Sequence, residues 1–305
     1  MEAGLDKINH LFQSRDKALG SAEAVTLARA ASALEKDNLA RNADYLAKCF
    51  LGNKYTLYLK FPLLCRWLFE YVAPGGYCYF NARTKHIDRT FLEVLGEDIR
   101  QFVILGAGYD SRPYRFREQL INIKIYELDL PSTQSRKKEC LIKEFGAIPD
   151  HVIYVPIDFN AQSIKDVLVE KGYKPFEKTF FIWEGVTYYL NTDAVDNVLD
   201  FVAKNSKAGS SIIFDYALRS FIEGDYSTYG ARKLVKIWEK FGEPGLSGIE
   251  DGGIEAFLRQ KGFDMVSDLG PEELEQTYLK REDGTLLGKV FGCMRIAHAK
   301  VKKCI

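Results

Sequence analysis

The amino-acid sequence predicts an α/β protein with a doubly wound, mostly parallel sheet. Between residues 100 and 215, short apolar runs alternate with stretches of helical spacing, which is typical of repeated strand–helix–strand units. The first apolar run, residues 101–105, breaks into a Gly-x-Gly turn, as a buried parallel strand does when its end meets a ligand. The crossovers between these strands should be right-handed.

The predicted elements of this alternating region have ordinary lengths for strands and helices. The strands that we expect are 101–105, 123–128, 152–155, 179–183 and 210–214. The helices between them are expected at 132–145, 161–171 and 192–206. Residues 99–215 therefore form the expected ligand-binding core.

The residues before this core have a helical pattern. Residues 21–50 are rich in Ala, Leu, Glu and Lys, with apolar positions at helical spacing and Ser21 as a candidate N-cap. Helical patterning continues through 56–72, stops at an APGGY segment and resumes at 84–95. We expect a helical N-terminal cap over residues 1–98.

After residue 215 the rhythm changes. Residues 216–243 look helical and are rich in tyrosine and charge, and residues near the C-terminus read as one more strand. No linker or repeat divides the chain. We expect a single domain over residues 1–305, in which 216–289 is an insertion that covers the substrate and 290–305 holds the last strand.

The composition is that of a globular protein without a nucleic-acid partner. Lys+Arg and Asp+Glu both number 42, so the chain has none of the positive field that a phosphate backbone selects. The six cysteines form no C-x-x-C pair, and no Cys/His group has the spacing of a zinc site. We expect no metal and no nucleic acid.

The sequence also predicts a cytoplasmic protein that does not enter a membrane. Its most apolar helix candidate, residues 55–72, is interrupted by Lys60, Pro62 and Arg66, which favours a core segment over a membrane span. The first ten residues lack the basic and apolar regions of a signal peptide. The cysteines are then expected to be reduced thiols in the core.

The turn after residues 101–105 points to a nucleoside ligand. Asp129 lies 23 positions after Gly106, at the end of the next expected strand, where a carboxylate can accept hydrogen bonds from two ribose hydroxyls. A dinucleotide fingerprint needs a third glycine, but Ser111 stands at that position after Gly106 and Gly108. A ligand with a ribose and no phosphate fits better, and S-adenosyl-L-methionine is the obvious candidate. A turn without a ligand and a nicotinamide-dependent oxidoreductase are the alternatives.

Four segments, taken together, resemble a known family. They are LGAGYDSRPYRF (105–116), YELDLP (126–131), VPIDFN (155–160) and WEGVTYYL (183–190). In this order they resemble the leucine carboxyl methyltransferase family of class I methyltransferases, and most closely its branch of small-molecule O-methyltransferases. The resemblance implies a Rossmann-like fold with a seven-stranded sheet, S-adenosyl-L-methionine as methyl donor and S-adenosyl-L-homocysteine as product.

The same resemblance implies which residues hold the methyl donor. The candidate cofactor-binding residues are Arg83, Gly106, Gly108, Asp129, Asp158, Phe159 and Glu184. Arg83 would bind the carboxylate of the methionine part, because a guanidinium matches a carboxylate with two parallel bonds. Asp158 and Phe159 would meet the edge and the face of the adenine.

Glu184, Tyr188 and Tyr189 are the catalytic candidates. Glu184 directly follows the expected strand 179–183 and so belongs at the carboxyl end of the sheet, where open α/β sheets bind ligands. A carboxylate there can pair with the cationic amine or sulfonium of the donor. The two tyrosines follow at the mouth of the expected site, where either can hydrogen-bond the methyl acceptor.

For the acceptor, we expect contacts from beyond the glycine turn and from the late insertion. The candidate substrate-binding residues are Tyr114, Arg219, Tyr226 and Tyr229. The sequence has no Ser-His-Asp set, and its four histidines are scattered. This favours a carboxylate or an acidic hydroxyl as acceptor, because a carboxylate is ionised at neutral pH and needs no general base. Glu184 or a tyrosine is the alternative, as a base for a hydroxyl.

The expected function is methyl transfer to oxygen of a small-molecule metabolite. One alternative is a carboxyl methyltransferase that acts on a protein C-terminus. Relatives of that kind place an arginine where this chain has Asn160, which weakens this alternative. Another is a protein that binds the methyl donor without transferring its methyl group.

Overall fold

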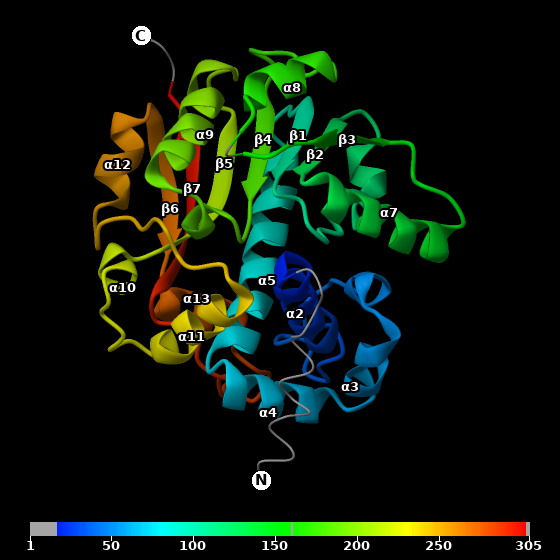
Figure 1. Ribbon diagram of the computed structural model, residues 1–305, viewed down its shortest axis with the longest axis vertical. Helices are drawn as coiled ribbons and strands as arrows, with labels where there is room; N and C mark the ends of the chain where they lie inside the picture. The colour runs from blue at the N-terminus through cyan, green and yellow to red at the C-terminus, as the bar shows by residue number, and fades with distance from the viewer. Residues whose placement is uncertain (1–16, 160, 303–305) are drawn as a thin grey trace.

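A seven-stranded sheet forms the centre of the computed structural model, which describes residues 17–159 and 161–302. In chain order, its strands are β1 (Gln101–Leu105), β2 (Lys124–Asp129), β3 (Val152–Pro156), β4 (Thr179–Trp183), β5 (Ser211–Ala217), β6 (Phe263–Leu269) and β7 (Met294–Val301). They lie in the order β3-β2-β1-β4-β5-β7-β6 (Figure 1). β1 to β5 pair in parallel, and β7 is antiparallel to both of its neighbours. The prediction of a doubly wound, mostly parallel sheet is confirmed.

Six of the seven strands lie where the sequence predicts them, within a few residues. β5 runs three residues further than expected, to Ala217. β6 is the strand that the sequence analysis did not locate. It lies at the edge of the sheet and exposes Asp264, Met265 and Val266, so it lacks the apolar run that marks the buried strands.

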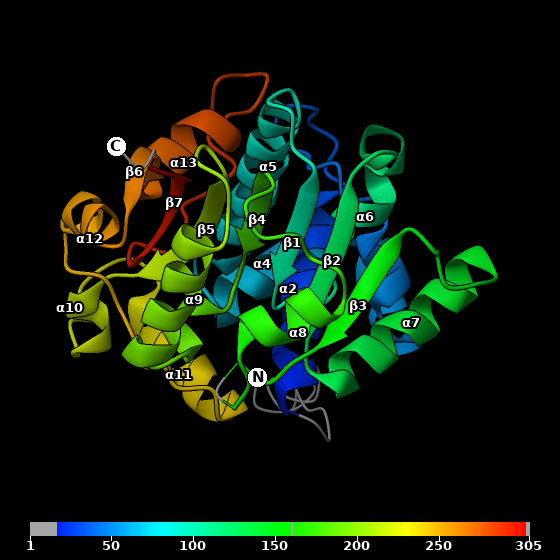
Figure 2. The same cartoon turned by 90° about the horizontal axis from the view of Figure 1, so that it is seen from above.

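Helices cover both faces of the sheet (Figure 2). Phe102 and Ile104 of β1 point into one core, while Val103 and Leu105 point into the other, as the alternation along a strand requires. The first core is covered by α5 (Gly76–Leu95), α7 (Pro131–Phe145) and α13 (Pro271–Tyr278), and the second by α8 (Ile164–Glu170), α9 (Thr192–Lys204) and α12 (Ile254–Gln260). The strand ends thus remain the open side of the sheet.

The N-terminal cap is helical, as expected, but its helices have other bounds. They are α2 (Lys17–Ser32), α3 (Thr56–Lys60), α4 (Pro62–Val72) and the start of α5, with short 3-10 turns at Ala47–Phe50 and Asn53–Tyr55. The helix expected over 21–50 ends at Ser32. There the amide of Asn42 donates to the carbonyl of Arg29 (3.1 Å), so a side chain from the following segment satisfies the end of the helix.

The expectation that residues 55–72 form a core segment is right for only one face of α4. Cys65 and Phe69 are buried. Leu63, Trp67 and Tyr71 are at least half exposed, and the rings of Trp67 and Tyr71 stack on the surface with centroids 6.0 Å apart. None of the described helices is long and apolar enough to cross a bilayer.

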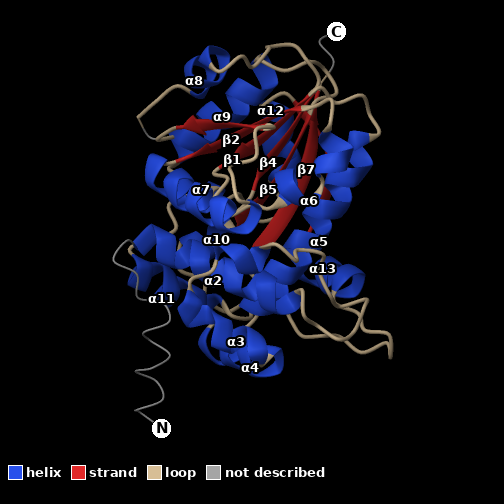
Figure 3. Ribbon diagram, turned by 90° about the vertical axis from the view of Figure 1, so that its right-hand side faces the viewer, coloured by secondary structure: helices blue, strands red, loops and turns tan. Residues whose placement is uncertain are grey.

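The late insertion is less helical than predicted. Of residues 216–243, only α10 (Arg219–Ile222) and α11 (Ala231–Phe241) are α-helical. α11 lies beside α2 on the side of the sheet where the parallel strands end (Figures 1 and 3). Two segments that are far apart in the sequence therefore meet near the ends of the parallel strands.

Candidate active site

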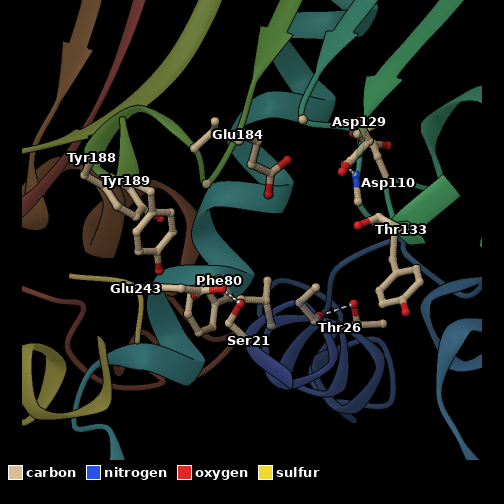
Figure 4. Close-up of a pocket in the computed structure, with 18 of the residues that line it drawn as sticks. Ser21, Thr26, Phe80, Asp110, Asp129, Thr133, Glu184, Tyr188, Tyr189 and Glu243 are labelled. Carbon is tan, nitrogen blue, oxygen red and sulfur yellow. Dashed lines mark hydrogen bonds between the residues drawn. The ribbon is translucent and has the colours of Figure 1, made fainter. Parts of the chain in front are cut away.

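A cavity of about 340 Å³ lies between the strand tips and the helices α2, α5 and α11. The sheet contributes the residues that directly follow β1, β2 and β4, among them Gly106, Leu130 and Glu184. Figure 4 shows Glu184 between the two tyrosines, Tyr188 and Tyr189, on one side and Asp129 on the other. The cavity is where open α/β sheets bind their ligands.

The turn after β1 requires glycine at its first position. Gly106 has a φ of +69°, and a Cβ there would lie 2.4 Å from Cγ2 of Val186. Gly108 has a φ of +41° and faces open space. A side chain at Gly106 would therefore be strained and would collide with the loop after β4.

Asp129 is held at the end of β2 by backbone donors. The N–H groups of Gly108 and Leu130 donate to its two carboxylate oxygens, at 2.5 and 2.7 Å. Burial raises the pKa of Asp129, although these backbone hydrogen bonds oppose the shift. The carboxylate is thus fixed in orientation at the mouth of the glycine turn, where it lines the cavity.

Two arginines hold Glu184 in place. Nε of Arg83 lies 2.9 Å from Oε1 of Glu184, and Nη1 of Arg112 donates to Oε2 at 2.7 Å. Burial raises the pKa of Glu184, but the two guanidinium groups outweigh it and lower that pKa to about 2. Glu184 therefore stays ionised at neutral pH, which favours a role in holding positive charge and makes it a weak proton acceptor.

Arg83 has a second buried partner. Its Nη1 donates to Oδ2 of Asp215 at 2.5 Å, and Asp215 also accepts the hydroxyl of Tyr79 (3.0 Å) and the N–H of Gly185 (2.6 Å). Arg83 lines the cavity, as predicted for a residue that meets the methyl donor. The sequence analysis missed Asp215, although this residue directly follows the expected strand 210–214, just as Glu184 follows 179–183; in the structure β5 continues to Ala217.

The cavity is acidic. Its described lining holds five carboxylates, Asp110, Asp129, Asp158, Glu184 and Glu243, against the guanidinium groups of Arg29 and Arg83. Both guanidiniums are buried in ion pairs, Arg29 with Asp44 at 2.9 Å and Arg83 with Glu184 and Asp215. Asp110 and Glu184 also pair with Arg112, at 2.6 and 2.7 Å, and the lining still holds more carboxylates than guanidiniums. A cationic ligand is therefore favoured over an anionic one.

Tyr188 and Tyr189 line the cavity at the end opposite Asp129 (Figure 4). Tyr188 stacks on Trp238 of α11, with centroids 5.0 Å apart and planes at 14°. Burial raises the pKa of both tyrosines. They are therefore protonated at neutral pH and can donate hydrogen bonds.

The predicted adenine contacts, Asp158 and Phe159, also line the cavity. Asp158 is exposed and Phe159 is half-buried against the core under α8. They follow β3, and this places them beside Asp129 at the end of β2. Asn160, on which the argument against a peptide acceptor depends, lies outside the described residues.

The four predicted substrate-binding residues are not among the residues that line this cavity. Tyr114 is buried under β2, where its hydroxyl bonds with Glu127 (3.1 Å) and with the hydroxyl of Tyr154 (2.8 Å). Its position beyond the glycine turn places it in the short helix α6 (Arg112–Arg115), which turns it away from the strand tips.

Of the other three, Arg219 begins α10, and Tyr226 and Tyr229 follow that helix. Arg219 pairs with Glu250 at the surface (3.4 Å). The ring of Tyr226 packs on Phe221, and the hydroxyl of Tyr229 bonds with Glu70. The late insertion instead contributes Leu234, Trp238 and Glu243 to the cavity. Their signal in the sequence is the helical spacing of Leu234, Trp238 and Phe241, which marks the buried side of α11.

Comparison with known proteins identifies the family. The sequence model of the leucine carboxyl methyltransferase family matches residues 22–203, more than half of the chain. The chain belongs to the leucine carboxyl methyltransferase family. The resemblance carried by the four sequence segments is thereby confirmed.

Relatives within this family carry related names. The chain is 30% identical over 222 residues to "Putative S-adenosyl-L-methionine-dependent methyltransferase YktD" of Bacillus subtilis, a match that covers 73% of this chain and 72% of that protein. It is 30% identical over 156 residues to a relative of the same printed class from Frankia alni, covering 51% of this chain and 54% of that protein. The chain is an S-adenosyl-L-methionine-dependent methyltransferase.

Solved structures give weaker likenesses. The magnesium protoporphyrin IX methyltransferase of Synechocystis, solved with bound S-adenosyl-L-homocysteine, is 13% identical with a TM-score of 0.46, covering 82% of this chain and all of that one. The structure titled "Crystal Structure of a putative sarcosine dimethylglycine methyltransferase from Galdieria sulphuraria" is 12% identical with a TM-score of 0.45, covering 74% of this chain and 86% of that one.

Proposed function

We propose that this family member transfers a methyl group from S-adenosyl-L-methionine to an oxygen atom of a small-molecule acceptor. The observation that carries this proposal is the cavity at the strand tips, in which the glycine turn, Asp129 and Glu184 face one acidic space. The family is described by transfer to a carboxyl group, which supports oxygen as the accepting atom. As in the sequence analysis, both a carboxylate and an acidic hydroxyl are acceptor groups to test.

The residues at the strand tips fit the methyl donor. A Cβ at Gly106 would collide with the side chain of Val186, so the turn needs glycine there, and Asp129 presents a fixed carboxylate for a ribose diol. We assign Asp158 and Phe159 to the adenine, and Arg83 and Glu184 to the amino-acid end. When bound, S-adenosyl-L-methionine supplies a methyl group activated by a positively charged sulfur.

The chain itself contributes position and charge. The ionised Glu184, held by Arg83 and Arg112, places negative charge where a cationic ligand needs it. Tyr188 and Tyr189 can donate hydrogen bonds to an acceptor oxygen and hold it in line for attack. The low pKa of Glu184 argues against a role as general base.

The test is transfer of an isotopically labelled methyl group, followed as labelled product and as release of S-adenosyl-L-homocysteine. Acceptors would be a panel of small carboxylic acids, phenols and alcohols beside peptides with a free C-terminus. We expect methylated small molecules. Methylation of peptides alone would support a protein tail as substrate. Tight donor binding with no product from any acceptor would support a sensor.

A further inference from the structure

A second cavity of about 90 Å³ adjoins the first on the side of the tyrosines. It lies between α2, α4 and α11, and the two cavities share wall residues that include Phe80, Leu234, Trp238 and Phe291. The walls that belong to the side cavity alone are mostly apolar, with Phe69 from α4 among them. The N-terminal cap and the late insertion thus build a space that continues the main cavity away from the strand tips.

The walls of this side cavity are fixed by ring packing. Trp238 stacks on Tyr188, and Phe221 meets it edge-on with centroids 5.4 Å apart. Tyr189 meets the same indole edge-on at 5.5 Å. Rings held on several sides leave a preformed apolar hollow, which can take the end of an apolar group that reaches in from the main cavity.

Glu243 lines the main cavity beside Ser21, which borders both cavities. α11 ends at Gly242, whose φ is +71°. This left-handed turn brings the next residue back toward the cavity, and the hydroxyl of Ser21 donates to Oε1 of Glu243 at 3.2 Å. Figure 4 shows this contact on the same side of the cavity as the tyrosines. A carboxylate at this place can accept a hydrogen bond and repels an anion.

We propose that the side cavity binds the apolar part of the methyl acceptor, and that the acceptor is an uncharged, hydrophobic molecule whose hydroxyl group donates to Glu243. As the bond from the donor sulfur to the methyl group breaks and the new bond from oxygen to the methyl group forms, Glu243 takes the hydroxyl proton. The proposal rests on the proposed function and narrows its acceptor class from carboxylate or hydroxyl to hydroxyl. Lys240 also borders the side cavity, but its side chain is exposed, and a hydrated ammonium gives little net attraction for an anion.

The test compares two probes of matched shape, 1-naphthol and 1-naphthoate, by titration calorimetry on the protein saturated with S-adenosyl-L-homocysteine. We expect 1-naphthol to bind about ten-fold more tightly than 1-naphthoate. The variant Glu243→Gln should narrow this difference by strengthening 1-naphthoate. Equal or tighter binding of 1-naphthoate by the unaltered protein would overturn the proposal.

A second measurement locates the probe. Ala24 of α2 borders the side cavity but not the main one, so Ala24→Leu should fill the hollow and weaken 1-naphthol about ten-fold without changing the affinity for S-adenosyl-L-homocysteine. Ala33→Leu, just after the same helix and outside both cavities, is the matched control and should change neither. Unaltered 1-naphthol binding in a folded Ala24→Leu would overturn the assignment of the side cavity.

The two proposals fail in different ways. If the unaltered protein does not bind S-adenosyl-L-homocysteine, the proposed function and this inference both fall. If it binds that product but prefers 1-naphthoate, only the acceptor class is wrong. If Ala24→Leu has no effect on 1-naphthol, only the assignment of the side cavity is wrong.

Discussion

The two halves of the cavity are built in different ways. The half under the strand tips comes from turns that directly follow β1, β2 and β4, so Gly106, Asp129 and Glu184 stand at the ends of apolar runs. The half around Trp238 comes from α2, α4 and α11, which lie far apart in the sequence. The first half can be read from local sequence, whereas the second depends on how distant helices meet.

The largest expected effect comes from removing the ion pairs that Arg83 makes with Glu184 and Asp215 in the half under the strand tips. Arg83→Ala would leave Asp215 without its buried partner and remove one of the two guanidiniums on Glu184. Removing one partner of a buried pair costs about 3–5 kcal/mol of unfolding free energy. Urea denaturation should measure this loss. An unfolding free energy close to that of the unaltered protein would contradict the claim that the ion pairs of Arg83 stabilise the fold.

The pH dependence of stability tests the same ion pair between Arg83 and Glu184. The pKa of Glu184 is lowered from 4.5 to about 2, so its contribution is fully present above about pH 4.5 and is lost as the pH falls toward 2. In Arg83→Ala the depression of that pKa should shrink, and the acid-induced loss of stability should shrink with it. An unchanged acid profile would assign the stabilisation of Glu184 to Arg112 alone.

The next effect tests the glycine turn. Gly106→Ala places a Cβ 2.4 Å from Val186 at a φ of +69°, and backbone strain of this kind costs about 1–3 kcal/mol before the collision is counted. We expect the affinity for S-adenosyl-L-homocysteine to fall by at least about ten-fold in calorimetry. Gly146→Ala, whose glycine also has a positive φ but lies outside the cavity and has open space around it, should leave that affinity unchanged.

A smaller loss is expected from the ribose contact. Asp129→Ala should weaken the binding of S-adenosyl-L-homocysteine by about 1–3 kcal/mol, because a charged acceptor of hydrogen bonds is removed. Asp264→Ala, on the exposed edge strand β6, is the control and should have no effect. Equal affinities of Asp129→Ala and the unaltered protein would rule out the ribose role.

The sequence predicts the position of the half under the strand tips well because its signals are local. A buried parallel strand is a continuous apolar run, and the residue after it must lie at the sheet edge, so Glu184 can be placed from residues 179–183 alone. The sequence analysis missed β6 because an edge strand with exposed Asp264 and Met265 has no such run.

The position of the half around Trp238 could not be predicted in the same way. Tyr226 and Tyr229 lie in the same insertion as Trp238, with similar composition around them, yet they face Phe221 and Glu70 instead of the cavity. What separates them is the start of α11 at Ala231 and its packing beside α2. That packing joins segments about 200 residues apart, and no local pattern encodes it.

The smallest expected effect on the affinity for S-adenosyl-L-homocysteine tests whether the two halves of the cavity act independently. Trp238 borders both cavities but stands on the side opposite Asp129. Sites that are far apart and share no partners are usually coupled by less than about 0.5 kcal/mol. Trp238→Phe should therefore change the affinity for S-adenosyl-L-homocysteine by less than this amount. The same variant should weaken 1-naphthol measurably, because the stacked wall loses part of its contact area. Near-UV circular dichroism would check that the aromatic packing around α11 persists. If Trp238→Phe lost donor affinity to the same extent as Asp129→Ala, the wall of distant helices would be part of the donor site, and the division of the cavity into a local and a distant half would be wrong.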